Sequence, residues 1–210
     1  MNETVKSILE RRSIRKYLSK PVPREYLEVI ANCGQFAATG SGKQPWHISV
    51  VQNKSLLDKI VKANIDFINN PPQEPLYEGE RDYGYENLNQ LTKSLPIEIL
   101  QSHMAQPGFD NFYGAPAAII ISGDISNDSS NADCANATQN MAVAAWSLGI
   151  GSCYIASFKM GLLSPNAKNL REELCIPEGY LPIFALSLGY ADGELMPRQP
   201  RLPDAISWIE

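Results

Sequence analysis

One segment of this sequence, residues 131–148, can form only a buried helix. Its small and apolar side chains are spread around nearly the whole circumference of a helix. A helix of this kind has no polar side to present to water, so it must lie in a core or between two subunits. Gly149 and Gly151 mark its end. The apolar residues are Ala132, Ala135, Ala137, Met141, Ala142, Val143, Ala144, Ala145 and Trp146.

The rest of the chain predicts helices and strands that alternate. Helices are expected at residues 3–12, in a segment that Pro23 opens, at residues 55–69 with Ser55 as N-cap, and at residues 164–174. Strands are expected at residues 46–51, 115–122 and 181–188. This order favours a layered α+β or α/β domain in which helices cover a sheet.

The 210 residues are expected to form a single domain, 1–210, with two irregular parts. Residues 70–112 contain five prolines and three tyrosines. This excursion is either a set of short helices that covers a pocket or a plain surface insertion. The tail at 194–210 has three prolines and no regular period, so it needs a surface to pack on, such as a partner chain.

Charge and cysteine content exclude several classes of protein. The net charge of −5 argues against nucleic-acid binding, which usually needs a basic face. Two histidines and four widely spaced cysteines argue against a metal site or a disulfide framework. The N-terminus lacks the apolar region of a signal peptide, and no run approaches the roughly 20 apolar residues that span a bilayer. We therefore expect a cytoplasmic protein without a membrane partner.

Basic residues gather near both ends of this acidic chain. The opening cluster spans residues 11–16, and a second pair, Arg198 and Arg201, lies in the tail. Arginines beside a serine hydroxyl suit a phosphate monoester, whereas the alternative is solvated charge at a helix end. If the clusters converge, they would hold one phosphate from opposite directions. The opening cluster comprises Arg11, Arg12, Ser13, Arg15 and Lys16.

Two further segments could contact a ligand. Residues 39–46 are small and polar before Pro45, so their backbone amides and hydroxyls could approach a ligand closely, although an ordinary turn would look the same. Residues 149–158 run from glycines into an apolar stretch that suits a flat aromatic ring, or simply a helix end followed by a buried strand. Cys153, within this stretch, is interpreted as a packing residue rather than a nucleophile.

Several motifs occur together and in a fixed order along the chain. They are Arg-Arg-Ser-x-Arg at 11–15, Gln-Pro-Trp-His at 44–47, Ala-Pro at 115–116, Gly-Ile-Gly-Ser-Cys-Tyr-Ile at 149–155, Leu-Gly-Tyr-Ala at 188–191 and Pro-Arg at 197–198. Over nearly the whole chain this set resembles the FMN-dependent nitroreductase family. The resemblance implies an α+β sandwich with a central, mainly antiparallel sheet flanked by helices. It also implies an intertwined homodimer with FMN sites at the interface.

The resemblance assigns three groups of residues to FMN. The phosphate and ribityl chain would meet Arg11, Arg12, Ser13, Arg15, Arg198 and Arg201. The partner subunit's loop would supply Thr39, Gly40 and Ser41. The ring would lie against Tyr154, Ile155, Ala156 and Ser157, with the Ala156 N–H reaching flavin N5. Many members carry asparagine at the position of Gly42, so one polar contact to the flavin is expected to be missing.

The implied activity is transfer of a hydride from NADH or NADPH through flavin N5 to a small acceptor such as a nitroaromatic or a quinone, with ping-pong kinetics. FMN would carry the chemistry, no side chain is expected to act as nucleophile or base, and Arg15 would stabilise negative charge on the ring. Other enzymes on the same scaffold remain open, including enone reductases, dehalogenases and flavin-degrading enzymes. A non-enzymatic flavin-binding protein and a plain interaction module are further alternatives.

Overall fold

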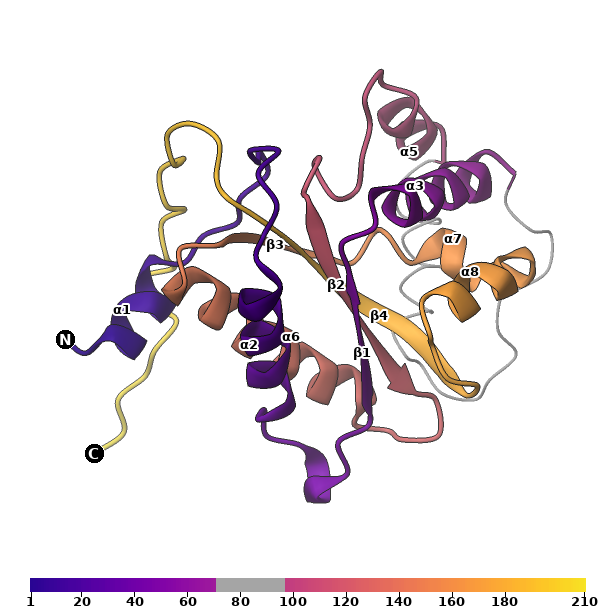
Figure 1. Ribbon diagram of the computed structural model, residues 1–210. Helices are drawn as coiled ribbons and strands as arrows, with labels where there is room; N and C mark the ends of the chain where they lie inside the picture. Colours follow the sequence, from indigo (N-terminus) through magenta and orange to yellow (C-terminus); the bar gives the residue numbers. More distant parts are fainter. Residues whose placement is uncertain (71–96) are drawn as a thin grey trace.

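The computed structural model describes residues 1–70 and 97–210, where helices cover both faces of a sheet (Figure 1). Four strands of this described part pair in the order β1-β2-β4-β3, and every neighbouring pair is antiparallel. The mainly antiparallel sheet flanked by helices is therefore confirmed. The strands are β1 (Trp46–Val51), β2 (Ala117–Asp124), β3 (Gly151–Ile155) and β4 (Tyr180–Gly189).

The helices form two layers, one on each face of the sheet. In Figure 1, α2 and α6 lie on one side and α3, α7 and α8 on the other, while α1 projects beside the end of α6. Within residues 1–70 and 97–210, no helix combines the length and the hydropathy that crossing a bilayer requires. The helices are α1 (Glu3–Glu10), α2 (Arg24–Gln35), α3 (Lys54–Asn69), α5 (Ile97–Met104), α6 (Ser130–Ser147), α7 (Met160–Leu163) and α8 (Lys168–Glu173), with 3-10 turns η1 (Gly40–Gly42) and η2 (Pro165–Ala167).

The position of β2 in the middle of the sheet explains why residues 117–121 are apolar without a break. Ile119 and Ile121 belong to the core under α2 and α6, whereas Ile120 points into the core under α3 and α8. A strand that is covered on both faces needs apolar side chains at every position. The predicted buried helix is α6, but one chain buries only one side of it: Ala137 and Met141 have no exposed surface, whereas Asn136, Gln139 and Asn140 are exposed.

Several predicted boundaries differ from the structure by one or two residues, and three of the differences have a visible cause or divide an element. The N-cap of α3 is Asn53 and not Ser55, because the Asn53 side-chain oxygen accepts the N–H groups of Ser55 and Leu56 at 3.0 and 3.3 Å. Strand β2 begins after Pro116, which has no N–H to donate to a ladder. The helix expected at 164–174 is divided into η2 and α8.

Of the excursion, the structure describes residue 70 and residues 97–112. It contains α5, which lies against α3 and donates a hydrogen bond from Gln101 Nε2 to the carbonyl of Ile68 at 3.1 Å. The tyrosines expected to shape this region, at 77, 83 and 85, lie outside the described residues. The role of the whole excursion therefore stays a prediction.

Candidate functional site

The two ends of the chain meet along the edge of the sheet. The N–H of Ile14 donates to the carbonyl of Ser152 in β3 at 2.9 Å, and the N–H of Leu18 donates to Tyr190, just after β4, at 2.9 Å. Residues 13–18 therefore run beside the sheet and bring the opening cluster to the start of the tail, as Figure 1 shows.

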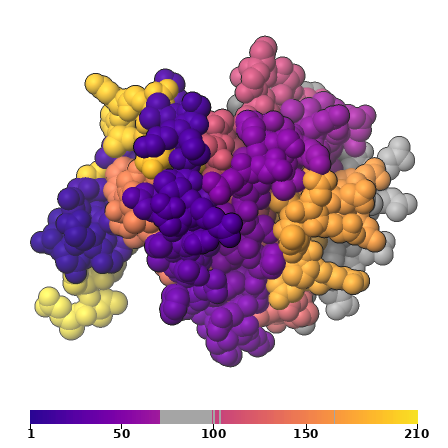
Figure 2. All heavy atoms as spheres, viewed as in Figure 1, coloured from indigo at the N-terminus to yellow at the C-terminus, as the bar shows by residue number. Residues whose placement is uncertain are grey.

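A pocket of about 660 Å³ lies between these two segments. Residues 11–16 form one wall and residues 191–201 the other, and Figure 2 shows indigo N-terminal atoms beside the gold atoms of the segment after β4. Six cationic side chains and only two carboxylates line it, so the pocket is locally basic although the protein is acidic overall. The lining includes Arg11, Arg12, Ser13, Arg15, Lys16, Arg198 and Arg201, with Asp192 and Glu194 as the acids.

Two of the arginines tie the ends of the chain to each other. Arg12 Nη1 donates to the carbonyl of Met196 at 2.8 Å, and Arg198 Nη1 donates to the carbonyl of Leu9 at 2.7 Å. The pocket therefore has a fixed shape that depends on reciprocal contacts. Arg11 and Arg201 also line it, and their guanidinium groups make no hydrogen bond or ion pair to the described part of the chain, so both are available to an anion.

The floor beneath Arg15 is buried and carries no ready nucleophile. Cys153 is 1% exposed and packs in the core, and burial raises the pKa of its thiol, which the nearby Arg15 charge partly offsets. Burial also raises the pKa of Tyr17, whose hydroxyl donates to the carbonyl of Ile14 at 2.6 Å and lies 2.8 Å from Ser187 Oγ. Both groups stay neutral at ordinary pH.

The segment predicted to face the ring leaves β3 and turns toward α7. The side chain of Ile155 is in the core, so only its backbone can face a ligand, while Ala156 and Ser157 are exposed. Tyr154 is 37% exposed and packs against Phe184, with ring centroids 4.8 Å apart. Their contact with a flavin stays a prediction.

The loop Thr39–Ser41 lies at the opposite end of α6 from the basic pocket (Figure 1). Both carboxylate oxygens of Asp133, in the first turn of α6, accept the N–H of Gly40 at 3.2 Å. At the other end of α6, the Arg12 guanidinium lies 5.9 Å from the Trp146 ring centre. Trp146 lies thirteen positions after Asp133 along α6, a distance of about 20 Å, so one chain does not bring this loop to its own pocket.

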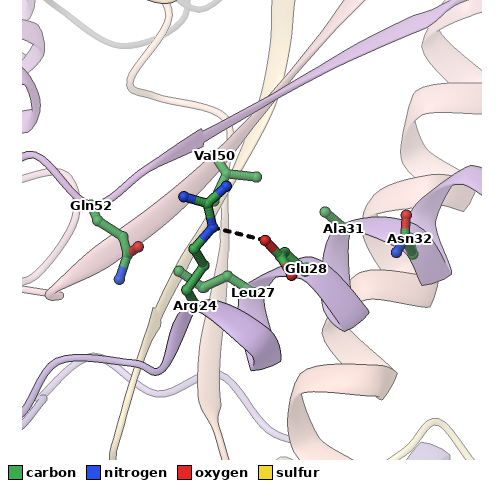
Figure 3. A pocket seen from close by; sticks show the side chains of 7 residues that line it. All are labelled: Arg24, Leu27, Glu28, Ala31, Asn32, Val50 and Gln52. Atoms are coloured by element: carbon green, nitrogen blue, oxygen red, sulfur yellow. Dashed lines mark hydrogen bonds and ion pairs between the residues drawn. The ribbon is translucent and has the colours of Figure 1, made fainter.

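A second pocket, between α2 and β1, is a weaker candidate for the functional site than the basic pocket (Figure 3). Its volume is about 460 Å³, and no predicted site residue lines it. Its arginine, Arg24, forms an ion pair with Glu28 at 2.8 Å, so it offers no unpaired cation.

Three residues that lie near the predicted site were not identified from the sequence. Asn64 is fully buried on the apolar side of α3, Asp133 holds the Gly40 loop, and Tyr113 lies under Arg15. Asn64 had a signal, because a polar residue stood at a buried helical position between Val61 and Phe67. Tyr113 had none, since its contact with Arg15 depends on the tertiary fold.

Comparison with known proteins agrees with this geometry. Residues 8–190 match the model of the Nitroreductase family. A nitroreductase with bound FMN from Bacteroides fragilis superposes with a TM-score of 0.79 at 25% identity, and one from Desulfitobacterium hafniense with 0.77 at 27%, each over 100% of both chains. An NADPH-dependent oxidoreductase of Staphylococcus aureus is 26% identical over 97% of this chain and 71% of its own length. The matched family model covers most of the chain, which therefore belongs to the nitroreductase family.

Proposed function

We propose that this protein is an FMN-dependent NAD(P)H oxidoreductase that reduces small acceptors such as nitroaromatics or quinones. The observation that carries the proposal is the convergence of arginines from both ends of the chain on one pocket. Solved relatives with FMN bound, and a relative named as an NADPH-dependent oxidoreductase, support the cofactor and the hydride donor.

The residues of the basic pocket fit a flavin mononucleotide phosphate. Planar guanidinium groups and a hydroxyl are the donors that phosphate oxygens accept best, and Arg11, Arg201 and the exposed Ser13 supply them. The volume of about 660 Å³ lies within the range of cofactor sites, about 300–1,000 Å³. Arg12 and Arg198 would shape this cradle through their bonds to the opposite segment.

Bound FMN would supply the redox chemistry, accepting a hydride at N5 and passing electrons to the acceptor. The chain's own residues would position the ring and supply charge beside it. Arg15 would hold a positive charge near N1 and O2, and the Ala156 N–H would face N5. A fixed charge of this kind stabilises negative charge without reorganisation, and no side-chain base is needed.

We propose that the active form is a homodimer. Apolar surface on α1 and at the C-terminal end of α2 lies open, with Ile8 52% and Phe36 88% exposed, and it borders a largely apolar pocket of about 750 Å³ between α1, α2 and α6. The tail is exposed as well, with Trp208 at 87%, and projects beside α1 (Figure 2). A second copy would cover both regions and bring its Thr39–Ser41 loop to the pocket.

The visible spectrum of the purified protein, followed by titration with NADH and NADPH without oxygen, tests the proposal. We expect a yellow protein whose flavin bands bleach with one equivalent of donor and return on addition of a nitroaromatic or a quinone. Sedimentation of the same sample should give twice the mass of the 23.2 kDa chain. A colourless protein that cannot be loaded with FMN would refute the proposal, and a yellow one that no donor bleaches would leave only flavin binding.

A further inference from the structure

A tight turn precedes β2 and is fixed by one carboxylate. Asp110 Oδ1 accepts the N–H of Phe112 at 2.7 Å, and Asp110 Oδ2 accepts the N–H of Gly114 at 2.8 Å. Phe112 is 1% exposed and packs on Phe158, with ring centroids 6.2 Å apart. The turn is therefore anchored in the core while the residues on either side of Phe112 point elsewhere.

Tyr113, in the middle of this turn, reaches toward the basic pocket. Its φ of 59° lies in the left-handed region, which a residue other than glycine adopts only where the surroundings enforce it. The Arg15 guanidinium lies 5.9 Å from the centre of the Tyr113 ring. The pKa of Arg15 is raised first by its interaction with Cys153 and then by a hydrogen bond with Tyr113. Tyr113 is 38% exposed, so it contacts Arg15 without filling the core.

Asn111, two residues earlier, holds the segment that follows β3. It is 4% exposed, and its Nδ2 donates to Ser157 Oγ at 3.4 Å while its Oδ1 accepts Asn64 Nδ2 at 3.1 Å. Asn64 Nδ2 also donates to the carbonyl of Ser157 at 2.7 Å, and Asn64 Oδ1 accepts the N–H of Gly161 at 2.9 Å. Ser157 is thus fixed by two buried amides, one of which belongs to the turn.

We propose that the Asp110–Gly114 turn is a positioning element that sets Arg15, through Tyr113, and the Ala156–Ser157 backbone, through Asn111, at a fixed separation around one flavin ring. This inference rests on the proposed function, in which Arg15 lies near N1 and O2 and the Ala156 N–H near N5. Apart from the contact of Tyr113 with Arg15, the turn takes no part in the basic pocket, since none of residues 110–114 lines it. It should therefore tune the reduction potential of the bound flavin more than the affinity for oxidised FMN.

The test compares Tyr113→Leu, Tyr113→Phe and Asp110→Ala. Tyr113→Leu removes the ring and the hydroxyl at a half-open position, so the fold should survive, and Asp110→Ala removes both acceptors of the turn. We expect both variants to bind reduced flavin about tenfold less well relative to oxidised flavin, a potential lower by about 30 mV for a two-electron couple. The dissociation constant of oxidised FMN, from fluorescence quenching, should change less than threefold. Tyr113→Phe, which keeps the ring, should recover most of the potential.

Asn53→Ala is the matched control, because Asn53 also accepts two backbone N–H groups, in the cap of α3. It should lower stability and leave the potential unchanged. A potential equal to that of the wild type in both Tyr113→Leu and Asp110→Ala would overturn the inference while the proposed function stands. A wild-type protein that takes up no FMN would refute the proposed function itself, and with it this inference.

Discussion

Replacing Gly161 with alanine would push apart two helices that the candidate site depends on. A Cβ at this position would lie 2.3 Å from the carbonyl carbon of Ala63 and 2.4 Å from the amide nitrogen of Asn64. Both are backbone atoms of α3 and cannot rotate away. Since ordinary contact begins at 3.4 Å, α7 would have to move by about 1 Å. That shift would lengthen the hydrogen bond from Gly161 to Asn64, now 2.9 Å.

The loss in free energy of unfolding caused by Gly161→Ala is the sum of three contributions. Overpacking of a dense core costs about 1–3 kcal/mol. A buried amide that loses its partner costs about 1–3 kcal/mol more. The higher helix propensity of alanine returns about 1 kcal/mol. We expect Gly161→Ala to lower the free energy of unfolding by about 3 kcal/mol, and the melting temperature by about 6–12 °C for a chain of this size.

Urea denaturation followed by circular dichroism measures this loss, and Gly34→Ala is its control. Gly34 is also a buried glycine in a helix, but its Cβ would meet the Met141 side chain, at 2.8 Å, which can change rotamer. Gly34→Ala should stay within about 1 kcal/mol of the wild type. Equal losses in the two variants, or none in Gly161→Ala, would refute the reasoning that backbone contact decides the cost.

Two other predictions concern charge and thiols. Arg201→Ala should raise the FMN dissociation constant about 10- to 100-fold, the effect of losing a charge-assisted hydrogen bond. Arg24→Ala, which removes an arginine paired with Glu28, should leave the constant unchanged. Equal dissociation constants for the two variants in a fluorescence-quenching titration would contradict this prediction. In iodoacetamide labelling read by mass spectrometry, the exposed Cys175 should react first and Cys134 only on unfolding, since burial raises the pKa of Cys134 to about 12. Cys33 should react faster once a dimer dissociates, because it lines the pocket between α1, α2 and α6. Early modification of Cys134 would contradict its burial.

Much of the fold could be predicted because the signals were local. The many small and apolar residues of α6 predicted a helix packed in the core, and the apolar run of β2 required cover on both faces. The N-cap of α3 was misplaced because Asn53 and Ser55 are both good caps two residues apart, and sequence alone does not rank them. Residues that act by holding others, such as Asn64 and Tyr113, could not be found, since their partners are distant in sequence.

The helix that constrained the fold also explains the arrangement of the proposed site. One end of α6 holds the Gly40 loop through Asp133, and the other end supports the opening cluster through the contact of Trp146 with Arg12. A rigid helix keeps these two parts about 20 Å apart in one chain. A two-fold axis near α6 would place the loop of one copy beside the pocket of the other, and would cover the exposed apolar surface of α1 and α2. Under the proposed function, then, dimerisation and completion of the site are the same event, and variants that separate the subunits should also release FMN.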